Sequence, residues 1–159
     1  MYSCCIQHFK FGVIAMSMML NTAYAGGVTT AIVNPTELYD PAPNGYSHAV
    51  IVSGGSRVAY IAGQGGENAQ GILSASFTDQ VAQAYRNLRI VLDELNASPQ
   101  QVTRINTYVV NYDPSMLEVM THYVKETFGD SLPAQTLVPV PRLALDGMLF
   151  EVDATAVLD

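Results

Sequence analysis

The stretch SFTDQVAQAYRNLRIVLDELNASPQQVTRINTYVV, residues 76–110, decides the fold because it joins a helix pattern directly to a strand pattern. Ser76 and Asp79 have the spacing of a capping box, in which the hydroxyl accepts from the third helical N–H and the carboxylate reaches back. Apolar residues then recur three and four positions apart, at Val81, Ala84, Leu88, Val91, Leu92 and Leu95. This spacing predicts a helix of about five turns with one buried face, ended by residues 96–99. The β-branched run 102–110 predicts a strand.

Toward the C-terminus, a second helix and two further strands are expected. The helix opens at 113–115, and Gly129 is suited to cap its C-terminal end. One stripe of this helix is apolar, at Leu117, Met120, Val124 and Phe128. Residues 136–140 and 148–157 are the last predicted strands.

Toward the N-terminus, residues 48–53 and 57–62 predict two strands joined by a hairpin turn at 54–56. Residues 26–46 are rich in turn signals and predict an irregular lead-in. The resulting order, β-β-α-β-α-β-β, places two hairpins around a β-α-β centre. It predicts a single α+β domain over 26–159, with one mixed sheet and both helices on one face.

The first 25 residues have the pattern of a signal peptide. Lys10 precedes the short apolar run 11–20, and Ala23-Tyr24-Ala25 forms an A-x-A ending. This pattern predicts cleavage after Ala25 and a periplasmic or secreted protein without a membrane anchor. The alternative is a start at Met16 or Met18, which would leave the protein in the cytoplasm. Both cysteines, Cys4 and Cys5, lie in this segment, so the mature domain would have none.

The charge balance argues against nucleic-acid binding. The chain carries a net charge of −7, and its seven Lys and Arg residues are scattered. Affinity for nucleic acid comes mainly from basic groups that neutralise phosphates, so no nucleic-acid partner is expected. The histidines lack metal-ligand spacing, and no metal site is predicted.

Short motifs along residues 34–157 together resemble the RidA (YjgF) family, which is also labelled endoribonuclease L-PSP. They are Asn34-Pro35, Tyr46-Ser-His-Ala-Val50, Tyr60-Ile-Ala-Gly-Gln-Gly-Gly66, Phe77 through Gln80 to Asn87-Leu88, Pro133-Ala134, Thr136-Leu-Val138 and Glu151-Val-Asp-Ala154. The resemblance implies a chorismate-mutase-like α+β fold, a homotrimer and small-molecule clefts between subunits. For some members it implies hydrolysis of enamines and imines to ketoacids and ammonia without a cofactor.

Gln135 departs from the family pattern. In the deaminases of the family, an arginine follows the Pro-Ala pair and binds the substrate carboxylate, and Gln135 occupies that position here. A guanidinium makes two charge-assisted bonds to a carboxylate, whereas a neutral amide supplies no charge. At about 1.5–3 kcal/mol for bonds to charged groups, the loss is roughly ten- to 150-fold in binding. The chain is therefore interpreted as a branch lacking the arginine.

Four further residues are candidates by resemblance. Glu151 matches an acidic residue that lines the family cleft and can serve as a general base, although a solvated strand position is equally expected. Tyr46 matches an aromatic residue at the cleft entrance, or else is a structural aromatic. Gly63 and Gln64 belong to a Gly-Gln-Gly-Gly segment that permits close backbone approach to a ligand, against the simpler interpretation of a tight turn.

Two functions of different classes follow. The first is a trimeric protein that hydrolyses a C=N bond of a small metabolite in an inter-subunit cleft, with Glu151 orienting water and Gln135 and Tyr46 holding the substrate. The alternative is a non-enzymatic small-molecule-binding or interaction module on the same trimer, which Gln135 itself motivates.

Overall fold

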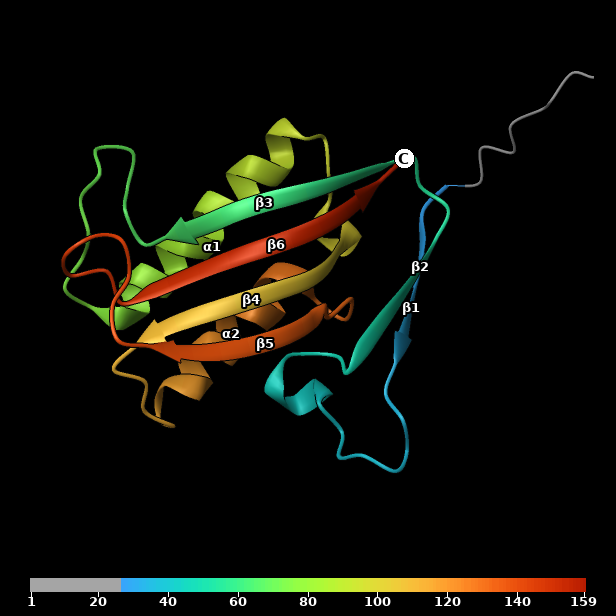
Figure 1. The fold of residues 1–159 in the computed structure, drawn as a ribbon, viewed down its shortest axis with the longest axis horizontal. Coiled ribbons are helices and arrows are strands. Elements are labelled where there is room, and N and C mark those ends of the chain that lie inside the picture. Colours follow the sequence, from blue (N-terminus) through green and yellow to red (C-terminus); the bar gives the residue numbers. More distant parts are fainter. Residues whose placement is uncertain (1–26) are drawn as a thin grey trace, which may run out of the picture.

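The computed structural model describes residues 27–159, so the predicted signal peptide at 1–25 lies outside the described residues. Two helices and six strands follow one another along the chain (Figure 1). They are β1 (Thr29–Val33), β2 (Ala49–Ser53), β3 (Arg57–Gly65), α1 (Phe77–Glu94), β4 (Val102–Val110), α2 (Met116–Phe128), β5 (Ala134–Val140) and β6 (Phe150–Leu158). Short 3-10 turns occupy Ala42–Asn44 and Pro99–Gln101.

The main sheet is mixed and has both helices on one face, which confirms the predicted α+β class (Figure 1). Its strand order is β3-β6-β4-β5, with β4 and β5 parallel and the other pairs antiparallel. The core lies between the sheet and the helices, where Tyr85 packs against Phe128 and Phe150. The opposite face of the sheet has no helix over it in the described chain.

The predicted hairpins are wrong at both ends of the chain. Residues 29–33 form a strand within the expected irregular lead-in, and β2 pairs with β1 in a separate two-stranded sheet, not with β3. Gly54 and Gly55 between β2 and β3 have φ of 77° and 81°, which lets the chain turn there so that β3 joins β6. The β-branched residues of β1 favour a strand. The turn signals that follow β1 led instead to the prediction of an irregular segment.

Strands β5 and β6 do not pair with each other because β4 lies between them. The connection from β4 to β5 runs through α2, and a crossover of that length allows parallel pairing. The sequence pattern marks both strands but carries no signal for which neighbour each one takes.

Helix α1 begins where the sequence predicts, with half of the expected capping box. Ser76 Oγ accepts from the backbone N–H of Asp79 at 3.3 Å. The returning bond is absent among the described residues, because the Asp79 carboxylate accepts from the Ser74 hydroxyl at 2.9 Å instead. The backbone N–H of Ser76 donates to Ser74 Oγ at 3.1 Å. At the end of α2, Gly129 has the expected positive φ and donates to the Lys125 carbonyl.

Gln80 on α1 ties two loops to the helix. Its side chain is fully buried. Its Nε2 donates to the carbonyls of Ser74 and Gly147 at 2.7 and 2.8 Å, and the N–H of Leu149 donates to its Oε1 at 2.8 Å. A Cβ on Gly66 would collide with Gln80. These contacts hold the loop that follows β3 against the segment that leads into β6.

Candidate functional site

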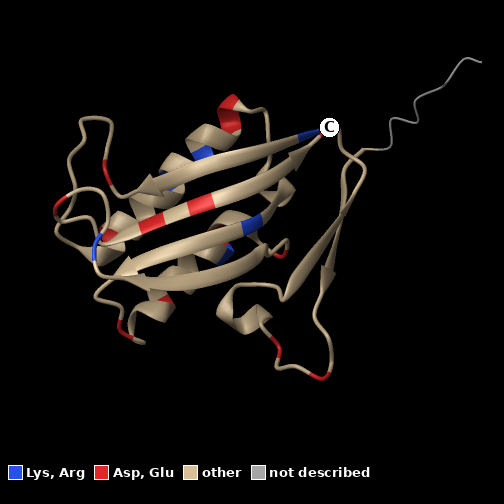
Figure 2. Cartoon of the chain, in the orientation of Figure 1, with Lys and Arg blue, Asp and Glu red and all other residues tan. Residues whose placement is uncertain are grey.

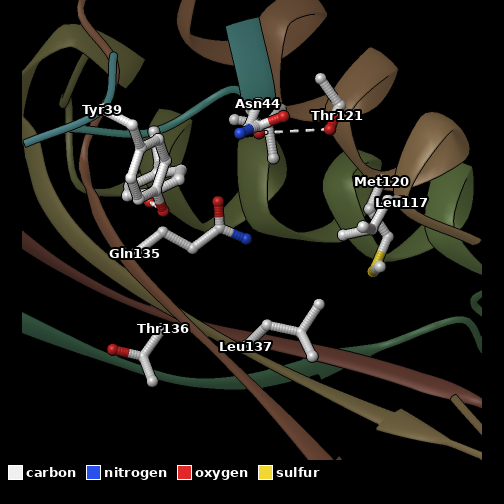
Figure 3. A pocket seen from close by; sticks show the side chains of 10 residues that line it. Tyr39, Asn44, Leu117, Met120, Thr121, Gln135, Thr136 and Leu137 are labelled. Atoms are coloured by element: carbon white, nitrogen blue, oxygen red, sulfur yellow. Dashed lines mark hydrogen bonds between the residues drawn. The ribbon is translucent and has the colours of Figure 1, made fainter. Parts of the chain in front are cut away.

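A cavity of about 430 Å³ lies between β5, α2 and the segment that precedes β2 (Figure 3). All of its lining side chains are uncharged. They are Tyr39, Asn44, Tyr46, Leu117, Met120, Thr121, Val124, Gln135, Thr136 and Leu137. The volume suits a small metabolite, and the mixture of apolar surface with a few polar groups is typical of ligand sites.

Gln135 points its amide into this cavity, below Asn44 (Figure 3). It lies on β5, where it is aligned with Ile105 of β4, a fully buried residue that faces the helices. Its Nε2 donates to Thr107 Oγ1 at 3.3 Å. One N–H of the amide is thereby directed into the protein, and its second N–H and its carbonyl oxygen can meet a ligand.

Tyr46 lines the same cavity, and its hydroxyl is hydrogen-bonded to that of Tyr39. The two rings are T-shaped, with centroids 6.4 Å apart. The Tyr39 hydrogen bond, with partial desolvation, raises the pKa of Tyr46 to about 12, so its phenol stays protonated. Sequence reasoning missed Tyr39. Its only signal in the sequence is that it is an aromatic residue in the turn-rich segment that precedes Tyr46. His48 Nε2 contacts the Tyr39 carbonyl at 3.0 Å and holds this segment in place.

Glu151 lies on β6 with its carboxyl group over Gly63. A Cβ on Gly63 would collide with the Oε1, Cδ and Cγ atoms of Glu151, so only glycine leaves room for this carboxyl. Burial raises the pKa of Glu151, and the nearby negative charges of Glu67 and Asp153 raise it further. Sequence reasoning missed Glu67, which lies in the loop after the Gly-Gln-Gly-Gly segment and has a buried Oε2 atom without a hydrogen-bond partner.

Asp153 lies on the same face of β6 and is held by neutral donors. The Asn106 amide donates to its Oδ1 at 2.8 Å, and the Tyr108 hydroxyl donates to its Oδ2 at 2.9 Å. This hydrogen bond to Asp153 is the main cause of the raised pKa of Tyr108. These bonds give Asp153 a structural role beside Glu151. Figure 2 shows these two carboxylates as adjacent acidic bands on β6.

Within one chain, the candidate residues form two groups on opposite faces of the main sheet. Gln135 and Tyr46 line the cavity on the helix side. Glu151 is paired with Tyr108, one position from the helix-facing Thr107, and therefore points to the open face. Gly63 lies with Glu151, whereas Gln64 is paired with Val152 of β6 and its side chain donates to the Ala62 carbonyl at 3.0 Å. The sequence does not predict this separation.

The sequence of the chain matches the family model described as Endoribonuclease L-PSP over residues 39–158. The chain belongs to the RidA (YjgF) family. It is 28% identical over 124 residues to the 2-iminobutanoate/2-iminopropanoate deaminase of Dermatophagoides farinae. This match covers 75% of this chain and 91% of that protein. It is 30% identical over 121 residues to a RutC family protein of Aquifex aeolicus, covering 74% of this chain and 92% of the relative.

A solved structure shares both sequence and fold with this RidA-family chain. The conserved Rid-family protein YyfB of Yersinia pestis is 36% identical, with a TM-score of 0.77, and the match covers 81% of this chain and 98% of that one. Within residues 27–159, no helix has the length and apolarity needed to cross a membrane. The same part of the chain contains no group of three or more His, Cys, Asp and Glu side chains arranged to hold a metal ion.

Proposed function

We propose that this chain hydrolyses the C=N bond of a small imine or enamine, without a cofactor, in a cleft shared between subunits of a homotrimer. The observation that carries the proposal is the Glu151 carboxyl, which lies over Gly63 with a raised pKa. A carboxylate whose pKa is moved toward neutral pH is suited to accept a proton from water. Membership of a family that includes an imine deaminase 28% identical to this chain supports the same chemistry.

A shared cleft accounts for the separation of the two groups of candidate residues. Gln135 and Glu151 face opposite sides of one sheet, so a single chain does not direct both at one ligand. The open face of the sheet carries exposed apolar side chains, including Val58 and Tyr60, which is 84% exposed. Contact between subunits would cover that surface. It would also bring the Gln135 cavity of one subunit to Glu151 of the next.

In the proposed reaction, Glu151 takes a proton from a water molecule as the oxygen attacks the imine carbon. The imine nitrogen gains a proton, which gives a carbinolamine. The carbon–nitrogen bond then breaks, the nitrogen leaves as ammonia after a further proton transfer, and the hydroxyl loses its proton to form the carbonyl. Holding water and imine together in this geometry supplies a large part of the rate.

The direct test is ammonia release from freshly generated imines by the native protein and by Glu151→Gln. The amide keeps the size of the side chain but cannot accept the proton, so we expect a loss of about 10²–10⁴-fold. Glu94→Gln is the matched control, because it makes the same change at an exposed position on α1. No release above buffer from any imine, with carboxylate or without, would contradict the proposed function.

A binding module without turnover is the second candidate, and the neutral cavity around Gln135 favours it. In that case small molecules would raise the melting temperature of the protein in proportion to their affinity and concentration. Stabilisation by a ligand together with an absence of turnover from its imine would support this candidate over the hydrolase.

A further inference from the structure

We infer that the Gln135 cavity selects ligands that carry no carboxylate, with a neutral carbonyl or amide where the deaminases of the family bind an acid group. The inference rests on the proposed function for the site, and it names the substrate class. The observation that carries it is the lining of the cavity, which contains neither Lys, Arg nor His.

The bound carboxylate would have no counter-charge within the described residues of the cavity. Lys125, on the same helix as Met120 and Thr121, does not line the cavity, and its Nζ donates to the Pro43 carbonyl at 2.9 Å. Arg142 follows β5 but forms an ion pair with Asp146 at 2.8 Å. A carboxylate that left water for this cavity would lose its hydration and gain only neutral donors, which is unfavourable.

The polar groups that do line the cavity match a neutral carbonyl or amide. Gln135 offers an N–H donor beside a carbonyl acceptor, which is the pattern that pairs with another amide. The hydroxyl pair of Tyr39 and Tyr46 can present one O–H donor to a ligand, because the bond between the two phenols uses one of their two hydrogens. The cavity can therefore satisfy a neutral group completely, whereas it can only partly satisfy an anion.

The rest of the cavity is apolar and would contact the body of the ligand. Met120 and Val124 are buried beneath it, and Leu117 stays 44% exposed at its side. Leu137 packs from the sheet, on the same face as Gln135 (Figure 3). Because burial of apolar surface is favourable, an aliphatic substituent on the ligand should improve binding.

The other part of the proposed cleft would repel an acid for a second reason. Glu67 and Asp153 lie close enough to Glu151 to raise its pKa through their charges. Arg104 lies on the same face, where its guanidinium donates to Asn106 Oδ1 at 3.3 Å, but within residues 27–159 neither carboxylate forms an ion pair with Lys or Arg. A carboxylate brought to Glu151 would meet like charge at short range. A neutral imine, or its protonated iminium form, would not.

The test compares two stable probes of nearly equal shape, 2-oxobutanamide and 2-oxobutanoate, by calorimetric titration of the native protein. We expect the amide to bind at least tenfold more tightly than the carboxylate. A carboxylate without a cationic partner lacks a charge-assisted bond, which contributes roughly ten- to 150-fold in binding. Gln135→Arg should reverse the order, whereas Gln100→Arg, which adds the same charge on an exposed turn, should leave it unchanged.

Equal or tighter binding of the carboxylate by the native protein would overturn the inference, and so would an absence of binding by both probes. Turnover is measured separately, as ammonia release from the imine of each probe. Binding of the amide without turnover would remove the proposed hydrolysis and keep the ligand class. Turnover of the carboxylate imine alone would keep the hydrolysis and remove the ligand class.

Discussion

Replacement of Gln80 by leucine tests whether this side chain holds the loops that frame Glu151. Leucine has nearly the same volume, so the change removes the three hydrogen bonds with little loss of packing. The carbonyls of Ser74 and Gly147 and the N–H of Leu149 would lose their partner in a site where the glutamine side chain is fully buried.

Each buried polar group left without a partner costs about 1–3 kcal/mol. Both loops can relax toward water, so we expect the lower part of the sum, about 3–5 kcal/mol, out of a total of about 5–15 kcal/mol for a domain. Urea unfolding would show this as a lower midpoint, and thermal unfolding as a fall in melting temperature of about 10–20 °C.

Gln83→Leu is the matched control on the same helix. Gln83 is half-buried, and its hydrogen bonds go to the side chains of Asn87 and Arg86 instead of to backbone groups of distant loops. We expect a loss below about 1 kcal/mol. If Gln80→Leu also lost less than about 1 kcal/mol, the three backbone groups would have other partners, and the structural role given to Gln80 would be refuted.

Gly63→Ala should displace the Glu151 carboxyl and lower the rate of imine turnover by about 10²-fold. The same substitution should have only a small effect on turnover in a Glu151→Gln background. Equal losses in both backgrounds would contradict the contact between Gly63 and the Glu151 carboxyl. At pH values above the pKa of Glu151, Glu151→Gln should raise the melting temperature of the protein. The raised carboxyl pKa costs stability as pH rises through it, and the gain should vanish at low pH, where both states are protonated. A constant difference between melting curves at all pH values would exclude this cause. Ser76→Ala should cost about 1 kcal/mol in urea unfolding, since it removes the N-cap of α1, and no measurable cost would show that Asp79 and Ser74 suffice.

Local patterns predicted both helices and the strands β2–β6, but they missed β1 and did not predict which strands pair. The spacing of Val81, Ala84 and Leu88 places one face of α1 in the core, where all three are fully buried. Strand pairing depends on contacts far apart in sequence, and nothing in residues 48–62 shows that Gly54 and Gly55 separate β2 from β3 instead of joining them.

The sequence marks candidate site residues one by one, but it does not predict how they are arranged. Gln135 and Tyr46 were singled out by resemblance, and the structure places both in one cavity. The opposite orientation of Glu151 follows from strand register, which the sequence does not specify. Tyr39 and Glu67 lie outside the regular elements, where no periodicity marks a residue as part of a site.

The activity of mixed assemblies of two variants is the central test of the proposed homotrimer and its shared cleft. Glu151→Gln removes the base, and Gln135→Trp fills the cavity, so each variant alone should release ammonia from the carboxylate-free imine at least about 10²-fold more slowly than the native protein. If the cleft joins residue 135 of one subunit to residue 151 of the next, random mixing leaves about one cleft in four intact. We predict that trimers reassembled from equal amounts of the two variants recover about a quarter of native activity. Mixed trimers verified by native mass spectrometry that stay inactive would contradict it.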